Sequence, residues 1–162
     1  MAGPLDIRPA AAEDAPALTA ILNAHVAGGT TTAIGERLTP PVFAHWFIDG
    51  PEALGALTAW EAEAAAGFQA LERGASAAEA EIATFAAPKA LRRGVGRALM
   101  EATRARARAL GFTALVATIR ADNAGGLAFY RAMEFRPWEI RRAVPLADGR
   151  LVDRVRLRLT LA

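Results

Sequence analysis

The sequence predicts a mixed α/β fold. Along the 162 residues, the hydrophobic pattern switches between the 3.6-residue period of helices and the two-residue period of strands. The elements follow in the order strand, helix, helix, three strands, helix, strand, helix and two strands, without an internal repeat. With 53% hydrophobic and 22% charged residues, the composition is that of a folded globular chain, and the length suits one domain over residues 1–162.

The first half of the chain is predicted to supply a strand, two helices and a hairpin. Residues 5–10 have the pattern of a short strand, and residues 12–26 have that of a helix opened by acidic residues. Residues 38–50 are expected to form a second short helix with prolines in its first turn. Two runs of strand length, 53–63 and 64–73, are expected to pair with each other.

The middle of the chain is predicted to supply a third strand of the sheet, residues 81–88, and the longest helix, residues 92–111. Leu110 belongs to the apolar side of that helix. Its solvated side is expected to carry three arginines, Arg104, Arg106 and Arg108.

The last part of the chain is predicted to supply a strand at residues 112–120, a helix at 121–134 and a hairpin of 135–146 with 149–161. In the final strand, apolar and polar side chains nearly alternate, as on a sheet with one face in water. Arg156 belongs to the polar set and is expected on the wet face.

The composition excludes several classes of function. The chain has no cysteine and only two histidines, so no metal site is expected. Nineteen basic and 17 acidic residues leave a net charge of +2, spread along the chain, so nucleic acid is not an expected partner. No run reaches the ~20 apolar residues of a membrane span, and the start lacks a signal-peptide pattern. We therefore expect a cytoplasmic protein without a membrane partner.

A strand-to-helix turn with two glycines carries the strongest chemical signal. Gly94 and Gly96 precede the long helix, so the backbone N–H groups of residues 93–98 can point outward at its N-terminus and bind an anion. Arginines that add positive charge at the rim are Arg92, Arg93 and Arg97. The turn lacks the Lys-Ser or Lys-Thr of a P-loop and the third glycine of a dinucleotide fingerprint. A tight turn with solvated arginines and no ligand is the simpler alternative.

Two stretches resemble a known family. The run FAAPKALRRGVGRALM, followed by LVATIRADNAGGLAFYRAMEFRP, resembles the acyl-CoA-binding core of the GCN5-related N-acetyltransferase (GNAT) superfamily. The opening IRPAAAEDAPALTAILNAHV resembles, more narrowly, the phosphinothricin acetyltransferase type. The resemblance implies a mostly antiparallel sheet of about six or seven strands, splayed between its two central strands and flanked by about four helices. It also implies acetyl-CoA as cosubstrate, no metal, and a homodimer.

The resemblance also implies where CoA binds. The glycine turn would hold the pyrophosphate, and Asn123 would contact the pantetheine arm in addition to capping its helix. Backbone N–H groups near Phe85 to Ala87 would stabilise the oxyanion if the strand bulges or splays there. The implied cofactor-binding residues are Phe85, Ala86, Ala87, Arg92, Arg93, Gly94, Val95, Gly96, Arg97, Ala98, Asn123 and Tyr130. The chain departs from the family pattern at Leu91, where Gln or Arg is usual, and at Glu134, where Gly is usual.

Acetyl transfer from a thioester to an amine needs a base for the ammonium proton and an acid for the departing thiolate. Glu81 resembles the general base of the phosphinothricin type, with Glu79 as a nearby competitor and a solvated charge as the simplest role. Tyr130, seven residues after Asn123 and on the same side of the helix, is implied as the acid. A core aromatic whose hydroxyl reaches water or backbone is the alternative.

The acceptor amine is the least determined part. The resemblance implies a small amino-acid-like substrate such as phosphinothricin, methionine sulfoximine or methionine sulfone. Candidates to hold its carboxylate or phosphinate are Arg73, Arg142 and Arg150. Ala147 and Leu151 replace the usual Lys and Trp of the last hairpin, so the pocket wall differs. A peptide or protein Nα-acetyltransferase, another small-amine acetyltransferase and a non-catalytic CoA-binding module remain as alternatives.

Overall fold

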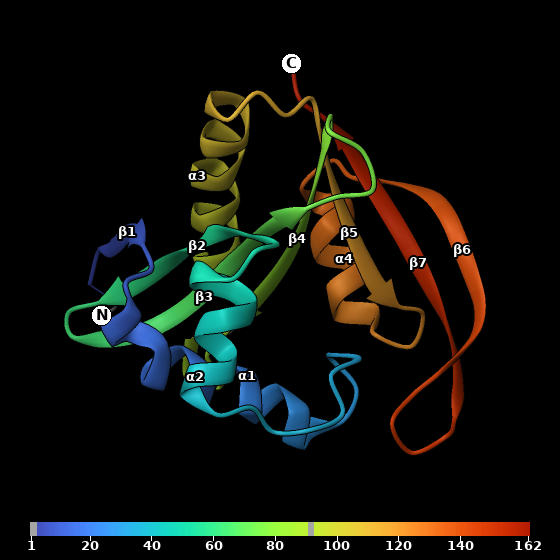
Figure 1. The fold of residues 1–162 in the computed structure, drawn as a ribbon, viewed down its shortest axis with the longest axis horizontal. Coiled ribbons are helices and arrows are strands. Elements are labelled where there is room, and N and C mark those ends of the chain that lie inside the picture. Colours follow the sequence, from blue (N-terminus) through green and yellow to red (C-terminus); the bar gives the residue numbers. More distant parts are fainter. Residues whose placement is uncertain (1–2, 91–92) are drawn as a thin grey trace.

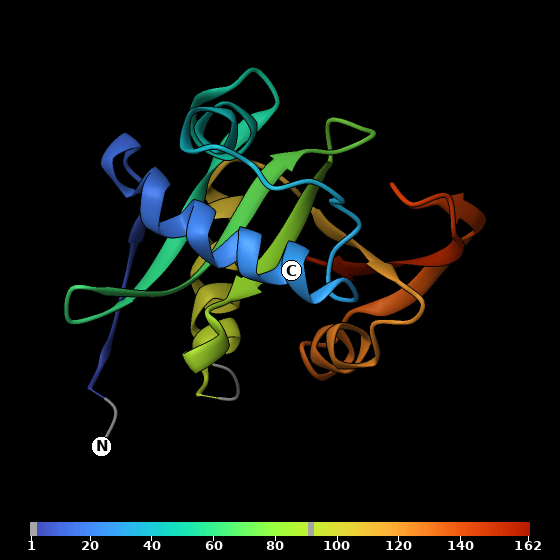
Figure 2. The same cartoon turned by 90° about the horizontal axis from the view of Figure 1, so that it is seen from below.

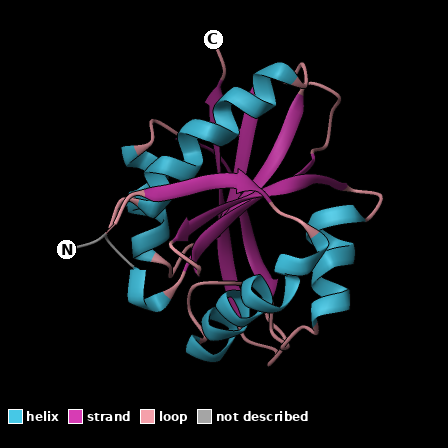
Figure 3. Ribbon diagram, turned by 90° about the vertical axis from the view of Figure 1, so that its left-hand side faces the viewer, coloured by secondary structure: helices cyan, strands magenta, loops and turns pink. Residues whose placement is uncertain are grey.

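The computed structural model describes residues 3–90 and 93–162, which form a seven-stranded sheet with helices on both faces (Figures 1 and 3). The strands are β1 (Leu5–Pro9), β2 (Ala53–Glu61), β3 (Ala64–Arg73), β4 (Glu79–Ala86), β5 (Ala114–Arg120), β6 (Arg136–Pro145) and β7 (Leu151–Thr160). The α-helices of the described residues are α1 (Ala15–Gly28), α2 (Pro40–Ala44), α3 (Val95–Ala109) and α4 (Ala124–Ala132). A π-helical turn, His45–Asp49, extends α2. The predicted fold class and element order are confirmed.

The sheet opens at its centre. Its strand order is β1-β2-β3-β4-β5-β7-β6, and every neighbouring pair is antiparallel except β4 with β5. These two parallel strands are paired only from Glu79↔Ala114 to Glu81↔Val116. β4 nevertheless continues to Ala86 and β5 to Arg120, so the strands diverge beyond Glu81 (Figure 1). This is the predicted splay between the two central strands.

One face of the sheet is covered by α1 and α2. In Figure 2, α1 crosses the strands at an angle. The core beneath it is an aromatic cluster whose rings are fully or almost fully buried: Phe43, Phe47, Phe68 and Phe85. Phe68 lies at its centre, 5.2 Å from Phe85 and 5.1 Å from Phe43 between ring centroids. These contacts fix the position of α1 and α2 over β3 and β4.

The opposite face is covered by α3 and α4. The buried side of α3 includes Leu99 and Met100, and α4 contributes Tyr130. Met100 and Tyr130 pack on a second core whose strand residues include Leu115 and Leu157, and Leu99 packs in a third core with Leu57 of β2. The apolar stripe of α3 faces the sheet, and the N-terminal residues of the helix line the same cavity as the end of β4.

Several predictions about individual side chains are wrong. Leu110 is 49% exposed, because α3 ends at Ala109 and the chain turns away at Gly111. Of the three arginines predicted on the solvated side of α3, Arg104 and Arg106 are partly buried and bind the carbonyl oxygens of Met133 and Leu54. Arg108 is exposed, as predicted. Arg156 is only 4% exposed, although its polar neighbours in the sequence indicated the wet face. No described helix is long and apolar enough to cross a membrane.

Replacing Phe68 by Ala is expected to lower the free energy of unfolding by about 3–5 kcal/mol, because it leaves a cavity inside the aromatic cluster. Urea unfolding followed by circular dichroism measures the change. The control is Val42→Ala, at a 40% exposed position of α2, which should change stability by less than about 0.5 kcal/mol. Equal effects of the two substitutions would contradict this account of the core.

Candidate active site

A cavity of about 880 Å³ lies where β4 and β5 diverge. Its walls come from the end of α1 and the loop after it, from β4 and β5, from the N-terminal turn of α3 and from α4, with one residue each from β3 and β7. Segments far apart in the sequence therefore meet around one space. The cavity contains both predicted catalytic residues, Glu81 and Tyr130, in its lining.

The splay leaves backbone groups of β4 facing the cavity. Gly74 N–H donates to the carbonyl oxygen of Glu79, and Ala87 N–H donates to that of Ala66. These bonds show that the odd-numbered residues of β4 exchange backbone hydrogen bonds with β3. The amides of Thr84 and Ala86 therefore point the other way, toward the side where β5 has diverged. Of the predicted oxyanion donors, Ala86 therefore faces the splay, whereas Phe85 and Ala87 are directed to β3.

His25, which the sequence left without a role, contacts this open edge. Its Nε2 lies 2.8 Å from the carbonyl oxygen of Ala86, and its Nδ1 lies 2.8 Å from Thr31 Oγ1. The ring also packs edge-on against Phe85. His25 thereby joins α1 to the open edge of β4, which no local sequence pattern indicates.

The glycine turn presents a bare helix N-terminus to the cavity. Gly94 has φ 80°, a left-handed conformation that favours glycine, and a Cβ there would meet nothing within 4 Å. The amides of Val95, Gly96 and Arg97 lie in the first turn of α3, where no intrahelical acceptor exists, and all three residues line the cavity. An anion can reach these N–H groups.

Two residues of the predicted turn are otherwise engaged. The Ala98 amide donates to the carbonyl oxygen of Gly94 at 3.1 Å, which removes it from the set of free donors. Arg93 forms an ion pair with Glu61, 2.7 Å away, and does not line the cavity. Leu91 and Arg92 lie outside the described residues.

Gly96 is required by packing between helices. A Cβ at this position would lie 2.7 Å from a ring carbon of Phe129 on α4. A protein side chain, and not a ligand, therefore fills the space beside Gly96. This differs from the sequence interpretation, in which both glycines make room for an anion.

Asn123 caps α4, as predicted. Its Oδ1 accepts a hydrogen bond from the amide of Gly126 at 3.0 Å. A Cβ on Gly126 would lie 2.5 Å from Asn123 Nδ2, so Gly126 is required by the cap itself. At Gly125, by contrast, the nearest atom to a Cβ would be 3.9 Å away, which leaves that side of α4 open to the cavity.

Tyr130 is buried at the inner wall of the cavity, with 2% exposure. Its hydroxyl lies 2.7 Å from Thr84 Oγ1, which accepts a hydrogen bond from Gln69 Nε2 at 2.7 Å. Burial raises the pKa of Tyr130 to about 12, and the hydrogen bonds with the side chain and the backbone of Thr84 oppose this only in part. The phenol is therefore protonated at neutral pH and available as a donor.

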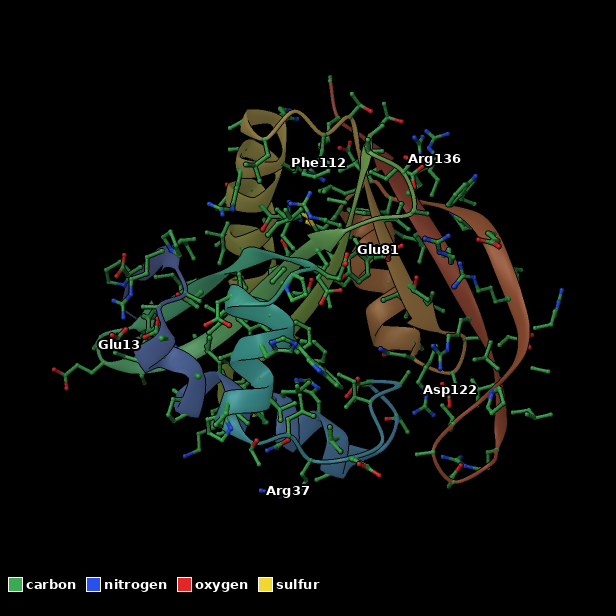
Figure 4. All side chains as sticks on the ribbon, in the orientation of Figure 1. Glu13, Arg37, Glu81, Phe112, Asp122 and Arg136 are labelled. Carbon is green, nitrogen blue, oxygen red and sulfur yellow. The ribbon has the colours of Figure 1, made fainter. Side chains whose placement is uncertain are left out.

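Glu81 lies on β4 at the point where the strands part, near the middle of the molecule (Figure 4). It forms an ion pair with the buried Arg156 of β7. Arg156 also donates to Glu139 of β6 at 3.1 Å, and its Nε lies 3.4 Å from Thr118 Oγ1 of β5. The predicted base is therefore held by a guanidinium that is itself held by two further strands.

Glu72, which the sequence interpretation did not consider, lies beside Glu81. The two residues are directly opposite in the β3–β4 ladder, and both line the cavity. Among the described residues, no hydrogen bond or ion pair engages the Glu72 carboxylate. Burial raises its pKa, and so do the charges of Glu81 and Glu52. The competitor Glu79 faces Arg158 instead, at 3.7 Å.

Arg120 ties the loop after α1 to the end of β5. Its Nη1 donates to the carbonyl oxygens of Gly29 at 2.8 Å and Thr32 at 3.0 Å. Its Nε and Nη2 donate to the Asp122 carboxylate at 2.9 and 2.7 Å, and this hydrogen bonding holds the pKa of Asp122 below its usual value. The loop that Arg120 secures forms part of the cavity wall.

The predicted substrate-binding arginines lie elsewhere. Neither Arg73 nor Arg142 lines the cavity, and Arg142 is 75% exposed and paired with Asp153. Arg150 pairs with Asp148 in the last hairpin. The cavity is lined instead by Arg154, whose buried Nε has no hydrogen-bond partner among the described residues. In the described part of the chain, no cluster of His, Cys, Asp or Glu is suited to hold a metal ion.

Gly96→Ala is expected to lower the free energy of unfolding by about 1–3 kcal/mol, because the new methyl group overlaps the Phe129 ring. In a double-mutant cycle with Phe129→Ala, the two substitutions should couple by at least about 1 kcal/mol. Gly125→Ala is the matched control, since its Cβ has room, and it should be neutral or stabilising. A cycle without coupling would contradict the assigned role of Gly96.

Tyr130 is the only tyrosine, so the ultraviolet absorbance of phenolate reports on this residue alone. We expect a midpoint near 12 in the folded protein and near 10 in urea. The stability that neutral Tyr130 contributes is complete below about pH 10 and is lost as the pH rises through about 12. Circular dichroism at each pH reports whether the chain is still folded. Phenolate formation near pH 10 in folded protein is the contrary outcome.

Comparisons with known proteins agree with the geometry. The model of the acetyltransferase (GNAT) family matches residues 21–135. No curated protein sequence matches the chain. A crystal structure of a candidate phosphinothricin N-acetyltransferase is 26% identical, covers 98% of this chain and 99% of its own, and gives a TM-score of 0.84.

Two further structures have the same fold. A GNAT superfamily phosphinothricin acetyltransferase from Sinorhizobium meliloti, in complex with acetyl-CoA, is 23% identical over 98% of this chain and 89% of its own, with a TM-score of 0.84. The ribosomal-protein-alanine N-acetyltransferase of Brucella melitensis is 24% identical over 96% and 99%, with a TM-score of 0.84. Because the family model covers well over half of the sequence, the chain belongs to the acetyltransferase (GNAT) family.

Proposed function

We propose that the protein is an acetyl-CoA-dependent N-acetyltransferase that acts on the primary amine of a small amino-acid-like substrate, of the phosphinothricin, methionine sulfoximine or methionine sulfone type. One observation carries the proposal. A single cavity joins an open strand edge, a bare helix N-terminus, a pair of carboxylates and a buried phenol. These are the groups that acyl transfer from a thioester to an amine requires.

The cavity fits acetyl-CoA. The N–H groups of Val95, Gly96 and Arg97 suit a pyrophosphate, and the side of Gly94 that a Cβ would occupy is open. The amide of Ala86, which faces the splay, suits an amide group of a pantetheine arm, as the backbone of a further strand would. Structures related to this chain include proteins in complex with acetyl-CoA. Acetyl-CoA would supply the activated acetyl group.

The acceptor amine must lose a proton before it can attack. An amine with a pKa near that of lysine is about three units from neutrality at pH 7, which corresponds to roughly 4 kcal/mol. The adjacent carboxylates of Glu72 and Glu81 offer a base at the cavity wall. The resemblance assigns this role to Glu81.

Tyr130 acts on the departing sulfur. Full proton transfer from a phenol of pKa about 12 to a thiolate of pKa about 8.5 is uphill by more than three units. Tyr130 therefore stabilises the developing thiolate best as a hydrogen-bond donor. Thr84 Oγ1 accepts from Gln69 and can donate to the phenol oxygen, which leaves the phenolic proton free to point into the cavity.

Arg154 supports an acidic group on the acceptor. It lines the cavity two residues before Arg156, on the same face of β7 and therefore on the side where the Glu72–Glu81 pair lies. Its guanidinium, whose Nε has no partner among the described residues, can bind a carboxylate or phosphinate while the amine faces the carboxylates. This arrangement matches an amino-acid-like substrate, which carries both charges.

We further propose a cytoplasmic homodimer. The edge strand β6 exposes two large apolar side chains, Trp138 at 52% and Ile140 at 51%. An exposed apolar edge of this kind is a surface that a second copy can cover.

The test is release of free thiol from acetyl-CoA with a panel of amino acids, phosphinothricin, methionine sulfoximine, polyamines, aminoglycosides and peptides. Amine-dependent release should be greatest with the amino-acid analogues. The double variant Glu72→Gln/Glu81→Gln should lower kcat/KM at least about 100-fold, and Tyr130→Phe at least about tenfold. Arg154→Gln should raise KM for an acidic acceptor and leave KM for acetyl-CoA unchanged.

Other outcomes redirect the proposal. Turnover on peptide N-termini alone would identify a peptide Nα-acetyltransferase. Binding of acetyl-CoA in a calorimeter without turnover on any amine would identify a non-catalytic CoA-binding module. No binding of acetyl-CoA would remove the proposal altogether.

A further inference from the structure

We propose that Glu72, and not Glu81, is the carboxylate that takes the proton from the acceptor's ammonium group, and that Arg156 holds Glu81 beside it as a fixed charge. The inference deepens the proposed acetyl transfer and rests on it. It contradicts the role that sequence resemblance gives to Glu81.

The positions of the two carboxylates permit either to act. Glu72 and Glu81 form a directly opposed, hydrogen-bonded pair in the β3–β4 ladder, so their side chains lie side by side. Both point to the face that carries α1 and α2, because their neighbours two residues along, Ala70 and Ala83, belong to that core. Both line the cavity. Position alone therefore does not choose the base.

The partners of the two carboxylates differ. Glu81 accepts from Arg156, whose side chain is 5% exposed and also bridges Glu139. Protonating Glu81 would leave the buried guanidinium without half of its neutralising charge, which is strongly unfavourable. Glu72 has no such partner among the described residues, so its oxygens are free to accept a proton from a ligand.

The surrounding charges favour the same choice. Burial is the largest cause that raises the pKa of Glu72. The negative charges of Glu81 on β4 and Glu52 before β2 raise it further. A proton on Glu72 relieves repulsion from both carboxylates. His45, from the π-helical turn, lines an adjoining hollow of about 450 Å³ with Glu52 and Glu72. A general base works best when its pKa is near the working pH, and the pKa of Glu72 is raised in that direction.

The transfer balances as follows. Glu72 takes one proton from the ammonium group, and the neutral amine attacks the thioester carbonyl carbon. The C–N bond forms and the C–S bond breaks. The nitrogen loses its second proton and the departing sulfur gains one, which yields the free thiol. Glu72 then returns its proton to water.

The experiment compares single variants with a matched control, Glu63→Gln, at an exposed turn between β2 and β3. Glu72→Gln should lower kcat at least about 100-fold and abolish the acidic limb of the kcat/KM profile. Glu81→Gln should keep the acidic limb of the kcat/KM profile and move it to lower pH, because removing the neighbouring negative charge lowers the pKa of Glu72. Glu52→Gln should move it the same way. Loss of the limb in Glu81→Gln but not in Glu72→Gln would overturn the inference.

Arg156 provides a second discriminating variant. In Arg156→Gln, Glu81 is free to accept a proton, so adding Glu72→Gln should cost far less activity than it does in the natural chain. An undiminished loss would contradict the assigned role of Arg156. Circular dichroism reports whether the variant is folded, and the single Glu variants stand independently if it is not.

A readout that needs no turnover separates this inference from the proposed function. With glutamate labelled by ¹³C at its side-chain carboxyl, the resonance missing in Glu72→Gln should titrate at higher pH than glutamate in a model peptide, because burial and the charges of Glu81 and Glu52 raise the pKa of Glu72. Titration at or below the pH of the model peptide would refute the inference even in an active enzyme. Failure of every amine to release thiol would remove the proposed function and leave this titration result standing.

Discussion

The rest of the structure depends on the short pairing between β4 and β5. Beyond Glu81↔Val116 the strands diverge, and the amides of Thr84 and Ala86 lose the partner that a continuous sheet would supply. Buried backbone groups without partners are costly, so an opening of this kind persists only where something else satisfies them. Part of the edge is satisfied within the chain, since His25 contacts the carbonyl oxygen of Ala86 and the Thr84 backbone hydrogen-bonds the Tyr130 hydroxyl. The Ala86 amide marks where an extended ligand can lie, and α3, α4 and α1 are positioned around that line.

Charge is divided between the two ends of this opening. The helix N-terminus at Gly94 offers backbone dipoles without a side chain in the way, whereas the opposite end gathers ionised side chains in a fixed arrangement. Arg156 is central there, because it links β4, β5 and β6 from its own strand, β7. A buried guanidinium with two carboxylate partners is a rigid feature, and it determines which neighbouring carboxylate is free to exchange protons.

Sequence patterns predicted the order of elements, the glycine turn and the cap at Asn123, because each depends on residues close together in the chain. They did not predict Glu72 or Arg154 as cavity residues, or Arg156 as the buried partner of Glu81. Alternation placed Arg156 on a wet face, yet the carboxylates of Glu81 and Glu139, 75 and 17 residues away, bury it. Gly96 shows the same limit: the sequence pattern predicts an anion-binding turn there, but the space beside Gly96 is filled by Phe129, which another helix supplies. Register between distant strands and contacts between helices are not encoded in local periodicity.

Arg120 has a mechanical consequence. Its guanidinium spans the mouth of the splay, joining the loop after α1, on the β4 side, to the end of β5. The Asp122 carboxylate holds the same group from behind. Arg120 therefore links the two halves of the sheet at the outer end of the splay. A ligand that pushed the halves further apart would have to break hydrogen bonds of a buried guanidinium. The width of the opening is thus fixed by the protein before a ligand binds.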